Sequence, residues 1–202
     1  MKISTSEARF AEIPCDAIVT GIHVDGIMGP VLRQIDETVG GIVAQLVDRK
    51  EITGKSAEVV RLLAPPGLAA RQLLVVGLGE RDQFGQAAAS HAAGAAAKLL
   101  ASKPQQNVVF CFESDWSHEV IATAISGAIA GCYGQDLYRA EKKLTPFEEI
   151  VWLGASREAL SEGEILGDCV NTTRRLINEP PSVMTPIRFA QEASEMAQRY
   201  GL

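Results

Sequence analysis

The sequence predicts an α/β fold: a three-layer structure in which helices flank a mixed, largely parallel sheet, followed by a long connecting helix. Short apolar runs alternate with longer segments of helical periodicity, which is typical of this class. Several of the runs are apolar at consecutive positions, as in strands buried on both faces. The chain has 202 residues, 47% hydrophobic and 22% charged, so it can build a hydrophobic core without a metal or disulfide.

Five segments are predicted to be strands, because each is a short apolar run that ends near a turn residue. The strongest is segment 72–77, which is apolar over consecutive positions and ends at Gly77. The predicted strands are 17–22, 58–63, 72–77, 107–112 and 149–154.

Three helices are predicted between these strands. In segment 31–46 the pair Gly40-Gly41 interrupts the helical pattern and indicates a break or a close approach. Segment 86–102 is rich in alanine, and its small side chains are expected to let the helix lie close against the sheet. Segment 117–133 begins with Ser117, a suitable N-cap residue.

The last fifty residues contain two helical patterns and no strand. Segment 156–178 is predicted to be one long helix that ends before Pro180-Pro181. Thr185-Pro186 then predicts the start of another helix, with Thr185 as the N-cap.

The end of that second helix resembles a Schellman ending, with Gly201 in the left-handed conformation and Leu202 packed back on Ala197. Because a strand commonly follows such a cap in α/β proteins, we expect the chain to be the front part of a longer polypeptide.

The charge balance argues against a general nucleic-acid binder. Nineteen basic and 25 acidic residues give a net charge of −6. Lys142-Lys143 and Arg174-Arg175 are short basic pairs without neighbouring aromatic residues. DNA attachment through such a local basic face remains an alternative function, which salt-dependent duplex binding would reveal.

The chain is expected to be cytoplasmic and without a membrane span. Residues 1–7 lack the apolar run of a signal peptide, and the apolar stretch 120–134 is shorter than the roughly 20 residues that a span needs. The four cysteines lie too far apart in sequence to indicate a zinc site, so they are interpreted as buried thiols of a reducing compartment. They are Cys15, Cys111, Cys132 and Cys169.

Two loops that follow predicted strands are candidate sites, each with a structural alternative. Gly77-Leu78-Gly79 is compatible with a dinucleotide-binding turn, but Asp82 stands where the third glycine belongs, so an ordinary tight turn is favoured. His23 and Asp25 follow another predicted strand and are candidates for a polar pair at a cleft mouth. Without an identifiable nucleophile, a structural histidine is favoured. No catalytic, cofactor-binding or metal-binding residue is assigned.

The segment 175–186, Arg-Leu-Ile-Asn-Glu-Pro-Pro-Ser-Val-Met-Thr-Pro, resembles the leucyl aminopeptidase (cytosol aminopeptidase) family. In that family an Arg-x-Leu-x-Asn-x-Pro segment followed by Thr-Pro opens the peptidase domain. Softer similarities extend over nearly the whole chain and lie in segments 36–41, 52–55, 74–79, 131–133, 137–139 and 142–143.

The resemblance implies a macro-domain-like N-terminal domain over 1–155, a linker helix over 156–178 and the start of a truncated peptidase domain over 179–202. It also implies that the parent enzyme removes N-terminal residues from peptides with two divalent metals, zinc, manganese or magnesium, and forms a hexamer. The chain itself is then a non-catalytic region with a support and assembly role, whose partner is the missing C-terminal peptidase domain.

The family's metal ligands lie in the second domain, within a signature Asn-Thr-Asp-Ala-Glu-Gly-Arg. Segment 171–174, Asn-Thr-Thr-Arg, matches only its first two residues, so no ligand is carried over and no cofactor is expected in this chain. Because macro-like folds in other families hold ADP-ribose at strand ends, an ADP-ribose or nucleotide-binding module is the remaining alternative.

Overall fold

The computed structural model describes residues 1–113, 115–134, 136, 138 and 140–201. Within these residues six strands form one sheet in the order β1-β6-β5-β2-β4-β3. Neighbouring strands are parallel, except that β3 runs antiparallel to β4. The strands are β1 (Lys2–Ser6), β2 (Ala17–Ile22), β3 (Val59–Leu63), β4 (Gln72–Gly77), β5 (Asn107–Phe110) and β6 (Glu149–Leu153).

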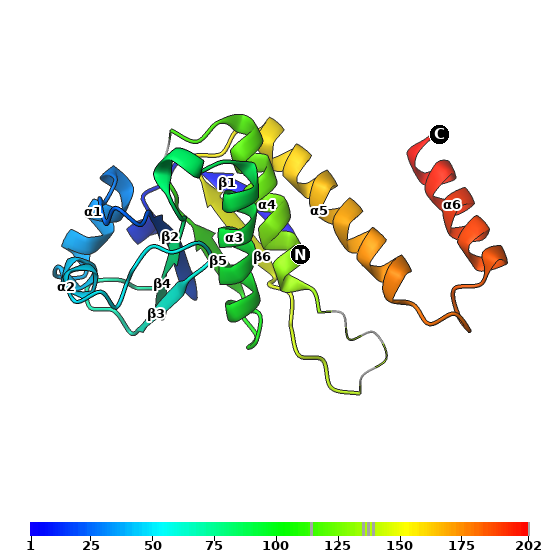
Figure 1. Cartoon of the computed structure of the whole chain (residues 1–202), viewed down its shortest axis with the longest axis horizontal. Helices are drawn as coiled ribbons and strands as arrows, with labels where there is room; N and C mark the ends of the chain where they lie inside the picture. The colour runs from blue at the N-terminus through cyan, green and yellow to red at the C-terminus, as the bar shows by residue number, and fades with distance from the viewer. Residues whose placement is uncertain (114, 135, 137, 139, 202) are drawn as a thin grey trace.

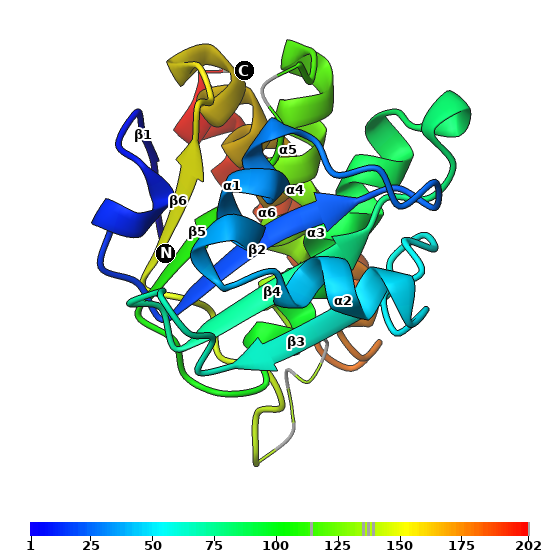
Figure 2. The same ribbon diagram turned by 90° about the vertical axis from the view of Figure 1, so that its left-hand side faces the viewer.

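Helices cover both faces of the sheet, so the predicted α/β class with a mixed, largely parallel sheet is confirmed. Figure 1 shows α1 and α2 on one face, α3 and α4 on the other, and α5 and α6 extending away from the sheet. In Figure 2 the view is from the side of α1 and α2. The helices are α1 (Pro30–Thr38), α2 (Ile42–Asp48), α3 (Gln86–Leu100), α4 (His118–Cys132), α5 (Arg157–Asn178) and α6 (Pro186–Tyr200), with 3₁₀ turns at Phe10–Glu12 and Arg81–Gln83.

Two hydrophobic clusters pack on the two faces. Successive residues of a strand point to opposite faces, and on β4 Leu74 joins the cluster under α3 and α4 while Leu73 joins the cluster under α1 and α2. The central strands are therefore apolar at consecutive positions, which is the pattern that predicted them.

The predicted strands are confirmed with small changes at their ends, and one strand was not predicted. Strand 107–112 ends at Phe110, strand 149–154 ends at Leu153, and strand 58–63 begins at Val59. The strand missed by the sequence analysis is β1, which pairs in parallel with β6 at the sheet edge. Its sequence, Lys-Ile-Ser-Thr-Ser, is mostly polar because an edge strand is partly exposed to solvent.

The segment predicted as a helix over 31–46 is broken into α1 and α2. Gly40 and Gly41 adopt positive φ values of 75° and 77°, which end one helix and allow the chain to start the next. Asp36 then caps α2, because its Oδ1 accepts hydrogen bonds from the backbone N–H groups of Val43 at 2.8 Å and Ala44 at 3.3 Å.

Helix α3 packs on the sheet through its buried alanines, and it also approaches α4 closely where α4 carries glycine. A Cβ added at Gly127 would lie 2.2 Å from the carbonyl oxygen of Ser90, and one at Gly131 would lie 2.4 Å from that of Gly94. Glycine is therefore required where the two backbones meet. The buried alanines of α3 belong to the cluster between α4 and the sheet.

Helix α5 packs on α4 through its first half. Its buried residues are Ala159, Leu160, Gly163 and Gly167. Helix α6 has no buried residue. Its predicted N-cap is confirmed, because Thr185 Oγ1 accepts a hydrogen bond from the N–H of Arg188. The left-handed conformation of Gly201 is also confirmed, at φ 70°. The expected contact of Leu202 with Ala197 lies outside the described residues.

The α-helices of the described residues are between 7 and 22 residues long. None of them combines the length and the apolar character needed to cross a membrane.

Candidate functional site

The loop Gly77-Leu78-Gly79 is a tight turn whose N–H groups are all used within the protein. Gly77 donates to the carbonyl of Glu58 at 2.8 Å, Leu78 to that of Ile22 at 2.9 Å, and Gly79 to that of Gly54 at 2.9 Å. A pyrophosphate site needs free backbone donors at a helix N-terminus. The three donors of this loop are engaged, so the geometry favours the structural alternative.

The local structure requires glycine at both Gly77 and Gly79. A Cβ at Gly77 would lie 1.8 Å from the carbonyl oxygen of Lys55, and Gly79 has a φ of +79°. The facing segment is held by Glu58, whose carboxylate accepts hydrogen bonds from the N–H groups of Thr53 at 2.8 Å and Gly54 at 3.0 Å. The turn therefore opens the connection from β4 to α3 and packs against the segment that precedes β3.

His23 and Asp25 lie near the carboxyl end of β2 but bind different partners. His23 is 8% exposed; its Nδ1 lies 3.1 Å from the carbonyl oxygen of Gly79 and its ring contacts the Phe84 ring edge-on. Asp25 accepts a hydrogen bond from Arg81 Nε at 2.8 Å, which lowers the pKa of the Asp25 carboxyl group. The expected His23–Asp25 pair is therefore not formed by a direct contact.

Three of the four cysteine thiols are poor nucleophiles. Burial raises the pKa of Cys111 and of Cys132 to about 12, and that of Cys15 to about 11, so these thiols stay protonated near neutral pH. Of the four thiols predicted to be buried, Cys111 and Cys132 are buried, Cys15 is half-buried, and Cys169 is exposed on α5.

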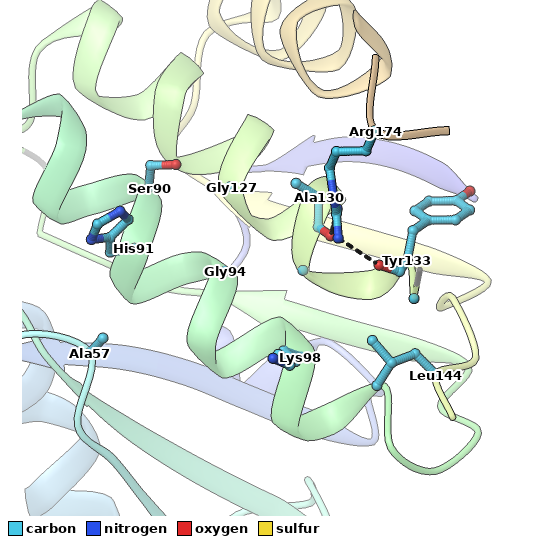
Figure 3. A pocket seen from close by; sticks show the side chains of 12 residues that line it. Ala57, Ser90, His91, Gly94, Lys98, Gly127, Ala130, Tyr133, Leu144 and Arg174 are labelled. Atoms are coloured by element: carbon cyan, nitrogen blue, oxygen red, sulfur yellow. Dashed lines mark hydrogen bonds between the residues drawn. The ribbon is translucent and has the colours of Figure 1, made fainter. Parts of the chain in front are cut away.

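A shallow cavity of about 600 Å³ lies over the contact between α3 and α4. Figure 3 shows His91 and Lys98 on α3, and Arg174 reaching down from α5 to the end of α4. Arg174 donates from Nη1 to the carbonyl of Ala130 at 2.7 Å and from Nη2 to that of Tyr133 at 3.2 Å. The guanidinium thus binds the last carbonyl groups of α4 and fastens α5 there.

The basic pairs do not form a free cationic face among the described residues. Besides Arg174, Arg175 donates to Glu192 of α6 at 2.7 Å. Lys142 donates from Nζ to the carbonyl of Asp136 at 2.5 Å, and the N–H of Lys143 donates to the Asp136 side chain. The side chains of Arg174, Arg175 and Lys142 are thus engaged within the chain, which weakens the DNA alternative.

No group of three or more His, Cys, Asp or Glu side chains within the described residues is arranged to hold a metal ion. His118, for example, contacts one carboxylate rather than a cluster of ligands: its Nε2 lies 2.6 Å from Glu162 of α5 at the surface. The donor set therefore does not fit the two-metal centre that the resemblance implies for the parent enzyme.

Within the described residues, most of the large hydrophobic side chains that are exposed to solvent lie on α5 and α6. A groove of about 650 Å³ between these helices is lined by Ile165, Leu176, Met196 and Tyr200 among others. Ile177 is 76% exposed and Ile187 is 73% exposed. One ionic cluster links the helices across the groove, because Glu192 binds both Arg175 and Arg188.

Comparison with known proteins identifies the family. The sequence profile described as "Cytosol aminopeptidase family, N-terminal domain" matches residues 19–142. A probable cytosol aminopeptidase of Rhodopirellula baltica is 36% identical over 171 residues, which is 85% of this chain. The chain belongs to the cytosol aminopeptidase family. Another family member, from Geotalea uraniireducens, is 30% identical over 93% of the chain.

The chain matches only part of each cytosol aminopeptidase. It spans 34% of the Rhodopirellula baltica relative and 40% of the Geotalea uraniireducens relative. Solved structures share the fold: a mutant of tomato leucine aminopeptidase superposes with a TM-score of 0.83 at 22% identity, covering 100% of this chain and 43% of that one. The bottromycin maturation enzyme BotP superposes at 0.66 with 25% identity, covering 93% and 38%.

Sequence reasoning missed the residues that hold the domain together around these loops. Glu58 binds the N–H groups of residues four and five positions earlier, Arg174 binds carbonyl groups more than 40 positions earlier, and neither stands in a motif. The Arg174-Arg175 pair was noticed as basic, but its partners depend on how α5 lies against α4 and α6.

Proposed function

We propose that this chain is the non-catalytic N-terminal region of a cytoplasmic, metal-dependent aminopeptidase, in which it supports and helps to assemble the enzyme. Residues 1–155 form the N-terminal domain, 156–178 the linker helix, and 179–202 the first part of the peptidase domain. Peptides are substrates of the complete enzyme only, and its two divalent metals, zinc, manganese or magnesium, bind outside these residues. The complete enzyme is a homo-oligomer, with the hexamer as the expected state.

One observation carries this proposal: most of the large hydrophobic side chains that are exposed within the described residues lie on α5 and α6, whereas the backbone donors of the loop 77–79 are engaged in structural hydrogen bonds. Tyr200, at 65% exposure, and Phe189, at 55%, belong to a helix without any buried residue. A surface of this kind is stabilised by covering it. The relatives, more than twice as long as this chain, have further sequence to do so.

The sheet domain contributes by fixing where α6 lies. A Cβ at Gly163 would lie 2.7 Å from the carbonyl oxygen of Ala122, so α5 sits directly on the backbone of α4. Arg174 fastens α5 again at the end of α4. With two attachment points, α5 presents α6 at a defined position relative to the sheet.

The proposal is tested by peptidase assay of the purified 202-residue chain with leucine p-nitroanilide and added Mn²⁺ or Zn²⁺. We expect no release above the blank, while the full-length Rhodopirellula baltica relative serves as the positive control. Metal-dependent turnover that co-purifies with the 202-residue chain would contradict the proposal. So would a full-length relative that keeps its assembly and activity after residues equivalent to α1–α4 are deleted.

A further inference from the structure

A further cavity, separate from the two described above, lies at the carboxyl edge of the sheet. Strands β2 and β5 are parallel neighbours, yet β2 leads into α1 on one face and β5 leads into α4 on the other. In open α/β sheets, the point where connections diverge to opposite faces is the crevice in which ligands bind. Here the cavity is lined by residues that follow β5, β6 and β1 and by α1.

The cavity is small and its walls are aromatic. Its volume is about 200 Å³, and Phe10, Phe112, Trp116 and Trp152 contribute to its lining. The rings of Phe112 and Trp116 are stacked with centroids 4.5 Å apart. Because drug-sized ligands occupy roughly 300–1,000 Å³, this space fits one apolar side chain or single ring rather than a nucleotide.

A carboxylate is fixed at the side of the cavity. Glu113 accepts hydrogen bonds from the N–H groups of Val31 at 3.2 Å and Leu32 at 3.3 Å, in the first turn of α1. Gly29 makes room for it, since a Cβ there would lie 2.3 Å from the Glu113 carboxyl carbon. This helix N-terminus already holds an anion, which disfavours a phosphate and leaves carboxylate lone pairs for a cationic group.

One cationic residue also lines the same cavity. Arg9 lines it and is exposed, and within the described part of the chain its guanidinium has no carboxylate partner. The cavity thus combines an apolar interior with one fixed negative group and one available positive group. These are the complements of an apolar side chain, an ammonium and a carboxylate.

We propose that this cavity binds a free α-amino acid with an apolar or aromatic side chain. The side chain packs against the aromatic rings that line the cavity, the ammonium group binds Glu113, and the carboxylate binds Arg9. Aromatic faces beside the ammonium add a cation–π attraction. The inference rests on the cavity alone and does not depend on the proposed role in an aminopeptidase.

Tryptophan emission tests the proposal directly, because the chain has two tryptophans and both line the cavity. The 202-residue chain is titrated with L-phenylalanine and L-leucine. We expect a saturable change in emission with a dissociation constant on the order of 1 mM, together with a rise in Tm. No saturable change up to about 50 mM for either amino acid would overturn the proposal.

Ligands that carry only one of the two charges separate the contributions. Phenethylamine lacks the carboxylate and 3-phenylpropanoate lacks the ammonium, so both should bind at least about tenfold more weakly than L-phenylalanine. Equal binding of either compound would overturn the assignment of a zwitterion.

Charge-neutral variants assign each contact. Glu113→Gln should weaken L-phenylalanine binding about tenfold and leave the binding of 3-phenylpropanoate unchanged. Arg9→Gln should also weaken L-phenylalanine binding about tenfold, but it should leave the binding of phenethylamine unchanged. The matched controls Glu37→Gln and Arg49→Gln change exposed groups that do not line this cavity and should bind normally. Circular dichroism establishes that each variant is folded. A folded Glu113→Gln variant that binds L-phenylalanine normally contradicts the proposal.

Discussion

Gly77 ends β4 at a point where the neighbouring backbone leaves no space for a side chain. A Cβ there would meet the carbonyl oxygen of Lys55 at 1.8 Å, and that oxygen belongs to backbone that cannot rotate away. We expect Gly77→Ala to lower the free energy of unfolding by about 3 kcal/mol in urea denaturation. Gly85→Ala is the matched control, because nothing lies within 4 Å of its added Cβ. Equal midpoints for the two variants would contradict this account of the turn.

The four thiols should differ sharply in reactivity. Cys169 is exposed, whereas the raised pKa of Cys111 and Cys132 keeps these buried groups protonated. Under native conditions a disulfide reagent such as Ellman's is expected to modify Cys169 first, and Cys169→Ser should remove that fast phase. In denaturant the wild-type chain should release four equivalents. A fast phase that survives in Cys169→Ser would show that a buried thiol is accessible.

At the scale of elements, Arg174 links α5 to the end of α4. Its hydrogen bonds to the carbonyls of Ala130 and Tyr133 involve a charged donor, for which a loss of about 2 kcal/mol is typical. Arg174→Met should lower stability by that amount, and Arg174→Lys should restore little, because a single ammonium cannot reach both carbonyls in the planar arrangement of guanidinium. Chemical denaturation measures both, with exposed Arg157→Met as the control.

The ionic contact between α5 and α6 depends on pH. The hydrogen bond from Arg175 lowers the pKa of Glu192, so the contact is fully present above the ordinary Glu value and is lost as pH falls through the lowered value. A distance probe placed on α5 and α6 should therefore report their separation at acid pH. Glu192→Gln should show the separated state already at pH 7. A pH-independent distance in the wild-type chain would contradict this role of Glu192.

The elements differ in how far their sequences determine them. Strand β4 and helix α6 were predicted at the observed limits, because β4 has four consecutive large apolar residues before Gly77 and α6 is marked by Thr185-Pro186 and Gly201. Strand β1 was missed, since the partner that makes it a strand, β6, lies almost 150 residues away. The contact of Glu113 with the first turn of α1 could not be predicted either. It depends on β2 and β5 being neighbours in the sheet, which the local sequence does not indicate.

For the whole molecule, protection should decrease from the sheet to the C-terminal helix. Backbone amides in β4 are buried between two helical layers, whereas α6 has no buried residue. Hydrogen exchange in dilute chain should therefore be much faster over 186–200 than over 72–77. If a second copy covers α6, its protection should rise with protein concentration. Strong, concentration-independent protection of both segments would contradict the expectation that α6 lacks a stable partner within this chain.

Helix α5 packs on α4 around Gly163 and Gly167, whereas its later contact through Arg174 is made by a flexible side chain, so a change at the packed part moves the helix as a lever. Beyond Gly167, its last buried residue, the helix continues for about 16 Å to Asn178 at 1.5 Å per residue. A tilt of about 10° at the pivot displaces that tip by about 3 Å, which is comparable to an atomic diameter. A methyl group inserted between α4 and α5 would therefore shift the end of α5, and with it α6, by more than its own size. Substitutions deep in the helical layer can then impair a contact far from them while leaving the sheet itself undisturbed.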